Sequence, residues 1–230
     1  MQQQQNPFVG KSLRIFLSYY NANKNLAGNI KSFLESYGIE VFLAHEDIQP
    51  LAEWQDVIIQ NLKGCDIFMP LLTRNFKQSE WTDQETGFAI SLGKVIIPLQ
   101  IDIPPYGFLG KYQGFKFNKS DEEKSCKDII KLIGNIAALK ENFKDCLINA
   151  LSNCGTFKIA SEIADLLEGM QPFLPQQIKE IIRISIENSQ VYDSFGARQH
   201  LRNWIAGYSE HIDNESKQTI CGLAKIHEEG

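Results

Sequence analysis

The first half of the chain alternates between two apolar patterns, and this alternation restricts its fold more than any other feature. Short apolar runs, which are typical of strands, alternate with segments whose apolar residues recur at helical spacing, which are typical of amphipathic helices. The run 66–72 is almost wholly apolar, which predicts a strand buried on both faces. Such strands, separated by helices, predict a parallel sheet wrapped by helices.

Five strands are predicted, at 13–20, 39–43, 66–72, 95–101 and 115–117. Five parallel strands with helices between them indicate a flavodoxin-like doubly wound α/β fold with the strand order 2-1-3-4-5. Folds of this kind bind ligands at the carboxyl ends of the first and third strands, where the strand order reverses. These ends are Tyr19–Asn21 and Thr73–Asn75, so we expect a ligand crevice between them.

The pattern changes beyond residue 120. Residues 121–128 are rich in charge, and only helical periodicity follows them. The helices do not match the repeat signatures of common solenoids. We therefore expect a disordered N-terminal tail at 1–11, an α/β domain at 12–120 and an all-α domain at 121–230.

The composition argues against several classes of function. The chain has 23 basic and 28 acidic residues and a formal net charge of −5, whereas a general nucleic-acid-binding domain is usually basic. Its five cysteines form no CxxC pair and its four histidines lack metal-ligand spacing, so we expect neither a disulfide framework nor a metal site. The glycine motifs of Rossmann dinucleotide sites and of P-loops are absent after the first strand.

The sequence predicts a soluble protein of the reducing cytoplasm. Residues 1–6 include a glutamine run and lack the basic and apolar regions of a signal peptide. No apolar run approaches the roughly 18 residues that a membrane-spanning helix needs.

The strongest candidate site begins at Trp81. Trp81 and Glu85 are four residues apart, so on a helix that starts near Ser79 they lie on one face. An aromatic ring beside a carboxylate excludes water and can stack on a flat ligand group, although the same pair is common on solvated helices. The predicted topology places this helix beside the ligand crevice, which favours Glu85 as a functional residue.

Residues 12–117 resemble a TIR (Toll/interleukin-1 receptor) domain of the bacterial kind. The resemblance rests on an ordered set of motifs: Ile15-Phe16-Leu17-Ser18-Tyr19, Gly38-Ile39-Glu40-Val41-Phe42, Ser79-Glu80-Trp81 followed by Glu85, and Gly93-Lys94 followed by Ile96-Ile97-Pro98-Leu99. Two departures concern the loop after the second strand, where Pro50-Leu51 replaces a frequent Pro-Gly pair and Ala44 stands where Asp is common. The helical remainder shows no such resemblance.

The resemblance implies an enzyme that cleaves NAD+ between nicotinamide and ribose, with Glu85 as the catalytic residue. Products in the family range from linear ADP-ribose to cyclic isomers, and bacterial members imply a role in anti-phage immunity. Other members are adaptors that only assemble, and many of them lack the glutamate, so its presence favours the enzyme. A non-enzymatic adaptor, a nucleotide sensor and a deoxyribosyltransferase-like enzyme remain alternatives.

A single carboxylate suits this reaction, because nicotinamide leaves as a neutral molecule and positive charge develops on the ribose. NAD+ is then the substrate, and we expect no cofactor and no metal. The candidate substrate-binding residues, chosen for their aromatic faces or their place at the end of the first strand, are Ser18, Tyr19, Tyr20, Trp54 and Trp81.

Enzymes of the family typically assemble through the loop after the second strand. By resemblance, the assembly loop consists of His45, Glu46, Asp47, Pro50 and Leu51. The expected partners are NAD+ and further copies of this chain, with no nucleic acid and no membrane. The domain at 121–230 is expected to oligomerise or to sense an activating partner or ligand.

Overall fold

A computed structural model describes residues 12–43 and 54–226. The predicted tail at 1–11 and the predicted assembly loop (His45, Glu46, Asp47, Pro50 and Leu51) lie outside the described residues. Contacts divide the chain into two compact units. The sheet unit holds 13–35 and 39–132, and the helical unit holds chiefly the residues from 133 onward.

The described strands of the sheet unit are all parallel. Its described segments are β1 (Arg14–Ser18), β2 (Glu40–Leu43), β3 (Ile67–Leu72), β4 (Val95–Ile96), β5 (Leu99–Gln100) and β6 (Phe115–Lys116). They lie in the order β2-β1-β3-β5-β6, with β4 also paired to β3. Since β4 and β5 together occupy the fourth position, this order confirms the predicted doubly wound sheet.

The predicted fourth strand at 95–101 is interrupted by a proline. Ile97 donates its N–H to Phe68 O at 3.0 Å, but Pro98 has no N–H and cannot continue the ladder. The strand therefore forms two short segments, β4 before this proline and β5 after it. Pro98 O still accepts the N–H of Phe115 at 2.8 Å, which joins β6 to the sheet.

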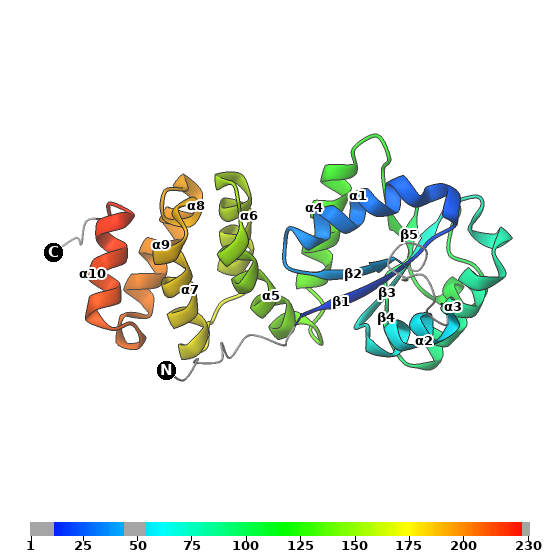
Figure 1. Ribbon diagram of the computed structural model, residues 1–230, viewed down its shortest axis with the longest axis horizontal. Coiled ribbons are helices and arrows are strands. Elements are labelled where there is room, and N and C mark those ends of the chain that lie inside the picture. Colours follow the sequence, from blue (N-terminus) through cyan, green and yellow to red (C-terminus); the bar gives the residue numbers. More distant parts are fainter. Residues whose placement is uncertain (1–11, 44–53, 227–230) are drawn as a thin grey trace. The chain divides into compact units, whose positions relative to one another are not determined.

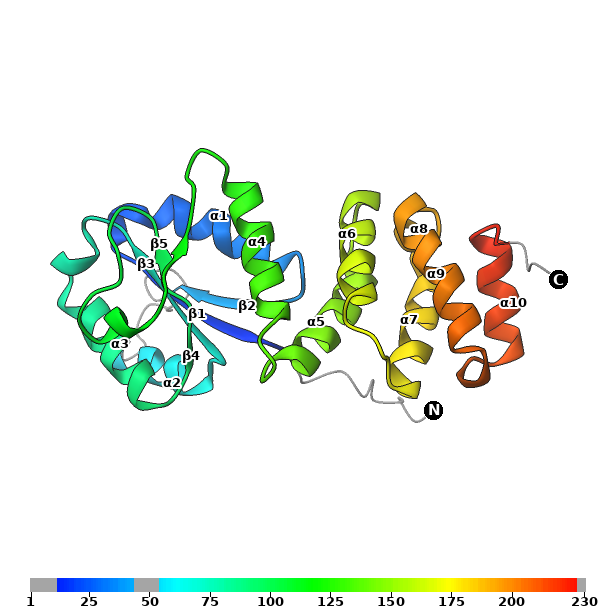
Figure 2. The same cartoon turned by 180° about the vertical axis from the view of Figure 1, so that it is seen from behind.

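Helices cover both faces of the sheet. The described α-helices of this unit are α1 (Lys24–Glu35), α2 (Trp54–Gly64), α3 (Glu80–Ser91) and α4 (Glu122–Gly134). α1 and α4 lie on one face, and α2 and α3 lie on the other (Figures 1 and 2). Most of α4 belongs to the sheet unit, although it follows the range 12–120 predicted for this domain. Asn29 of α1 donates to Glu122 Oε2 of α4 at 2.9 Å, so the two helices are joined directly.

An aromatic core supports α2 and α3. The rings of Phe16 in β1 and Phe68 in β3 stack with their centroids 5.8 Å apart. They belong to one buried cluster with Ile58 and Leu62 of α2 and Ala89 of α3. Every residue of β3 is buried, which confirms the prediction made from its apolar run. The core therefore holds α2 and α3 against the same face of the sheet.

The described part of the helical unit contains only helices, as predicted. They are α5 (Lys140–Asn153), α6 (Phe157–Glu168), α7 (Pro175–Glu187), α8 (Ser189–Tyr192), α9 (Phe195–Gly207), the 3₁₀ turn η4 (Ser209–His211) and α10 (Asn214–Leu223). Trp204 of α9 is buried and donates its indole N–H to Glu168 of α6 at 2.5 Å. His200 of α9 lies 2.7 Å from Asp165 of α6, so polar contacts as well as packing join these two helices.

Candidate functional site

Two buried polar side chains meet between β1 and α3. Ser18 is the last residue of β1 and is fully buried, and Glu85, in the second turn of α3, is only 4% exposed. The Ser18 hydroxyl donates to Glu85 Oε2 across an O–O distance of 2.5 Å. The two residues are 67 positions apart in the chain, so the position of the carboxyl group depends on the strand and the helix together.

Threonine side chains fix the start of α3. Ser79 occupies the N-cap position with extended backbone, but its side chain makes no capping hydrogen bond. Thr82 Oγ1 instead lies 2.8 Å from both Phe76 O and Ser79 O, to which it donates. Thr86 Oγ1 donates in turn to Thr82 O at 2.7 Å. These bonds anchor the two turns of the helix that carry Glu85.

The environment of Glu85 disfavours its charged form. Burial raises the pKa of the Glu85 carboxyl from its ordinary value of 4.5 to about 7, because the ionised group loses its hydration. The hydrogen bond from Ser18 acts in the opposite direction, since it stabilises the carboxylate. Glu85 is therefore divided between its acid and its ionised form near neutral pH.

A pocket of about 270 Å³ opens beside Glu85, between α2 and α3. Its lining residues are Gln55, Ile58, Ile59 and Leu62 from α2 and Trp81, Gln84, Glu85 and Phe88 from α3. Pockets for small molecules begin at roughly 300 Å³, so this volume suits part of a dinucleotide rather than the whole.

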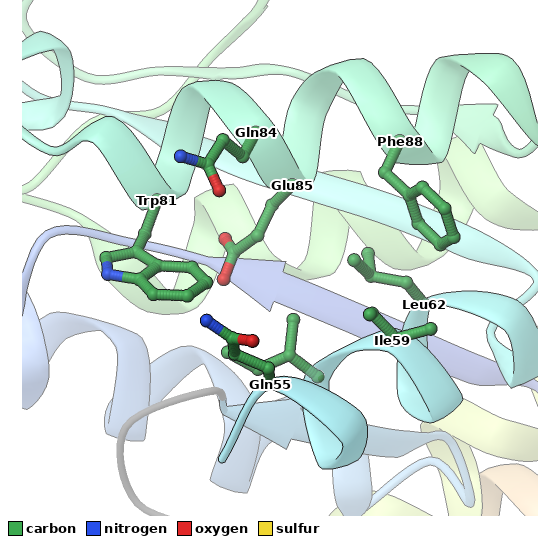
Figure 3. A pocket seen from close by; sticks show the side chains of 8 residues that line it. Gln55, Ile59, Leu62, Trp81, Gln84, Glu85 and Phe88 are labelled. Carbon is green, nitrogen blue, oxygen red and sulfur yellow. The ribbon is translucent and has the colours of Figure 1, made fainter. Parts of the chain in front are cut away.

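The pocket has a polar end and an apolar end. Figure 3 shows Trp81, Gln84 and Gln55 around the carboxyl group of Glu85 at one end. The other end is apolar and is formed by Phe88, Ile59 and Leu62 (Figure 3). The two helices therefore place an apolar compartment next to a lone carboxyl group.

The structure brings some of the predicted substrate-binding residues together and separates others. Ser18 contacts Glu85 directly, and Trp81 lines the pocket. Tyr19 is only 1% exposed, and neither Tyr19 nor Tyr20 lines the pocket. Trp54 is the first residue of α2, one position before the pocket residue Gln55.

Sequence reasoning missed several residues of the pocket. On α3 these are Gln84 and Phe88, which lie next to Glu85 and three positions after it. Helical spacing from Glu85 could have identified Phe88, because residues three apart share a helix face. Helical spacing could not identify Gln55 and Ile59 as pocket residues, because their place in the pocket depends on how α2 packs against α3.

Other kinds of reactive site are not found in the described parts of the chain. No group of three or more His, Cys, Asp or Glu side chains there is arranged to hold a metal ion. Burial raises the pKa of Cys65 to about 11 and that of Cys126 to about 12, so neither thiol is an activated nucleophile. None of the helices within 12–43 and 54–226 has the length and apolar character that crossing a membrane requires.

The arrangement can stabilise positive charge that develops on a bound ligand. The ionised Glu85 would face such a charge at the wall of a largely apolar pocket, where electrostatic attraction is stronger than in open water. Among the described residues that line the pocket, no second acidic side chain is present to act as a partner acid or base. The geometry therefore suits a reaction that needs one carboxylate.

The sheet unit has relatives among known protein families and solved structures. Residues 15–130, just over half of the chain, match the protein family described as TIR domain. Among solved structures, the TIR domain of the Toll-related receptor TRR-2 from the lower metazoan Hydra magnipapillata is similar, with 18% identity and a TM-score of 0.46 over 53% of this chain and 98% of that domain. A comparison with curated proteins finds no match. Because this family match covers more than half of the chain, the chain belongs to the TIR domain family.

Proposed function

We propose that this protein cleaves the bond between nicotinamide and ribose in NAD+, releasing nicotinamide and either ADP-ribose or a cyclic ADP-ribose isomer. The observation that carries the proposal is Glu85, a buried carboxyl group at a pocket walled by Trp81 and Phe88. The TIR family includes NAD+-cleaving enzymes, and Glu85 matches the glutamate of their Ser-x-Trp-x-x-x-Glu motif.

The chemistry of this bond needs charge stabilisation more than proton transfer. The pyridinium nitrogen takes the electron pair of the breaking bond, so nicotinamide leaves as a neutral molecule without a general acid. The ribose is left with oxocarbenium character at its anomeric carbon. An ionised Glu85 stabilises this centre electrostatically or attacks it to form an ester that water or a ring nitrogen then displaces.

Only the ionised form of Glu85 can play this part. Burial lowers the ionised fraction, and the hydrogen bond from Ser18 raises it. Ser18 therefore acts in this proposal as a positioning residue, because its buried hydroxyl orients one carboxylate oxygen and leaves the other for the substrate.

Assembly is the second part of the proposal. TIR domains commonly self-associate, which supports activation by contacts between copies of this chain. The helical unit is the candidate for receiving the activating signal, because its described residues carry no catalytic constellation of their own. Anti-phage immunity in a bacterial cytoplasm, by depletion of NAD+ or release of a signal nucleotide, is the setting that this proposal implies.

A non-enzymatic module that binds other TIR domains, or that senses a nucleotide, is the second candidate function. The burial of Glu85 favours it, because a buried carboxyl group that accepts a hydrogen bond from Ser18 can serve the fold alone. An adaptor predicts neither binding nor cleavage of NAD+. A sensor predicts saturable binding of NAD+ without release of nicotinamide.

Chromatography of NAD+ incubated with the wild-type protein, at rising protein concentration, separates these functions. The proposal predicts nicotinamide in amounts equal to ADP-ribose plus cyclic product, with a specific activity that increases with protein concentration. Intact NAD+ at every concentration, crowded solutions included, would overturn the proposal. Calorimetric titration of NAD+ into the same protein would then distinguish a sensor from an adaptor.

A further inference from the structure

Two side-chain amides flank the carboxyl group of Glu85. Gln55 comes from α2 and Gln84 from α3, and Figure 3 shows both amide groups at the same end of the pocket as Trp81. Both glutamines are exposed, and no hydrogen bond joins either amide to another residue within the described ranges. Their donors and acceptors are therefore available to a ligand in the pocket.

The charge of the pocket restricts which part of NAD+ it can hold. Glu85 is the only ionisable side chain among the described residues that line it, and no lysine, arginine or histidine is present there. A diphosphate placed here would meet a carboxylate without any compensating cation. The nicotinamide riboside end of NAD+ carries the positive charge and no phosphate, so the pocket suits this end.

The polar and apolar ends of the pocket determine how the nicotinamide riboside end of NAD+ is oriented in it. The apolar compartment of Phe88, Ile59 and Leu62 suits the planar nicotinamide ring, which becomes neutral when it leaves. With the ring there, the anomeric carbon lies next to Glu85 and the ribose extends toward the two glutamines. An amide donates and accepts hydrogen bonds, and so does each hydroxyl of a ribose, so the two kinds of group match.

We propose that Gln55 and Gln84 hydrogen-bond the 2′ and 3′ hydroxyls of the nicotinamide ribose and so select a ribosyl pyridinium as the substrate. This inference rests on the proposed function, because it assigns the groups that hold the substrate of that reaction. It makes the two glutamines binding residues that fix the sugar while Glu85 acts on the anomeric carbon. Gln55 lies outside the Ser-x-Trp-x-x-x-Glu motif, and Gln84 occupies one of its variable positions.

The test compares NAD+ with an analogue whose nicotinamide ribose lacks both hydroxyls. The variants are Gln55→Leu and Gln84→Leu, which keep most of the side-chain volume but lose the amide. The matched control is Gln60→Leu, because Gln60 is an exposed glutamine of α2 outside the pocket. Nicotinamide release is measured for each protein on both substrates, after subtraction of spontaneous hydrolysis, with thermal unfolding as a check on folding.

We expect each pocket variant to lower kcat/KM on NAD+ by about fivefold to tenfold, the usual effect of losing one hydrogen bond to a substrate. On the dideoxy analogue the same variants should match the wild type, and Gln60→Leu should match it on both substrates. Equal losses on both substrates, or no loss on either, would overturn the inference while the proposed function stands.

Failure of the proposed function gives a different result. If the wild type binds NAD+ without cleaving it, the affinities of the variants for NAD+ and for the dideoxy analogue test the inference. It is supported only if Gln55→Leu and Gln84→Leu weaken the binding of NAD+ and leave the binding of the analogue unchanged. If the wild type neither binds nor cleaves NAD+, the proposed function and this inference are both wrong.

Discussion

The hydroxyl of Ser18 lies 2.5 Å from Oε2 of Glu85, and both side chains are buried. This contact connects the end of β1 with α3, where strand and helix meet at the carboxyl edge of the sheet. It also opposes the effect of burial on the ionisation of Glu85. The pair therefore links the fold of the sheet unit to the charge state of its candidate catalytic group.

The pH dependence of activity should reflect this link. Glu85 acts as a carboxylate and its pKa is about 7, so kcat/KM of the wild type should rise with pH and reach half of its maximum near pH 7. Ser18→Ala removes a hydrogen bond that favours the ionised form, so the midpoint should move upward by roughly one pH unit. Initial rates of nicotinamide release between pH 5 and 9 measure both midpoints. An unchanged midpoint in Ser18→Ala would show that this bond does not set the ionisation of Glu85.

Stability should depend on pH through the same group. The pKa of Glu85 is higher in the folded protein than its ordinary value of 4.5, so the folded state holds its proton more tightly than the unfolded chain. The stability that this proton contributes is fully present below about pH 4.5 and is lost as the pH rises through about 7. Glu85→Gln keeps a neutral side chain at every pH. Its free energy of unfolding, relative to that of the wild type, should therefore rise by about 1–3 kcal/mol as the pH increases from 5 to 8.

Denaturant unfolding of both proteins at pH 5 and pH 8 measures this difference. The comparison is made between proteins at each pH, so the titration of all other groups cancels. A constant difference at the two pH values would mean that Glu85 titrates normally in the folded protein.

Trp81 should contribute by its shape and aromatic face. Trp81→Ala opens the polar end of the pocket to water and should lower kcat/KM for NAD+ by about tenfold or more, whereas Trp81→Phe keeps a ring there and should lose less. Steady-state rates at several NAD+ concentrations separate an effect on KM from an effect on kcat. Equal rates for Trp81→Ala and the wild type would show that the substrate does not contact Trp81.

The packing of the helical unit can be tested by stability measurements, which do not depend on the function of the protein. Trp204 is buried and bonded to Glu168, so Trp204→Ala should destabilise the helical unit by about 3–5 kcal/mol. Phe157 on α6 is 51% exposed, so Phe157→Ala should cost less than about 1 kcal/mol. Calorimetric unfolding of the full chain should show the effect of Trp204→Ala in one part of the transition. Similar costs for both variants would contradict the packing of α6 against α9.

The order of strands and helices could be predicted from the sequence because it depends on local patterns. The apolar run of β3 indicated burial on both faces, and the alternation with helical segments indicated a parallel sheet. The break at Pro98 was also present in the sequence, since a proline cannot donate to the ladder. It was missed because the apolar pattern continues across it.

The candidate site could be predicted only in part, because its groups come from distant segments. Glu85 and Trp81 share one helix, so their spacing was informative. Ser18 and Tyr19 are neighbours at the end of β1, and either of them could have met Glu85. The sequence does not say which, and the structure assigns the contact to Ser18 and leaves Tyr19 buried.

The most direct measurement compares nicotinamide release from NAD+ by the wild type, Glu85→Gln and Glu80→Gln at equal, high protein concentration. Glu80 is an exposed glutamate at the start of the same helix, so its variant controls for the loss of one charge. The account predicts that Glu85→Gln loses nearly all release while Glu80→Gln matches the wild type. Release that survives in Glu85→Gln, in a protein that folds normally, would contradict the role assigned to Glu85.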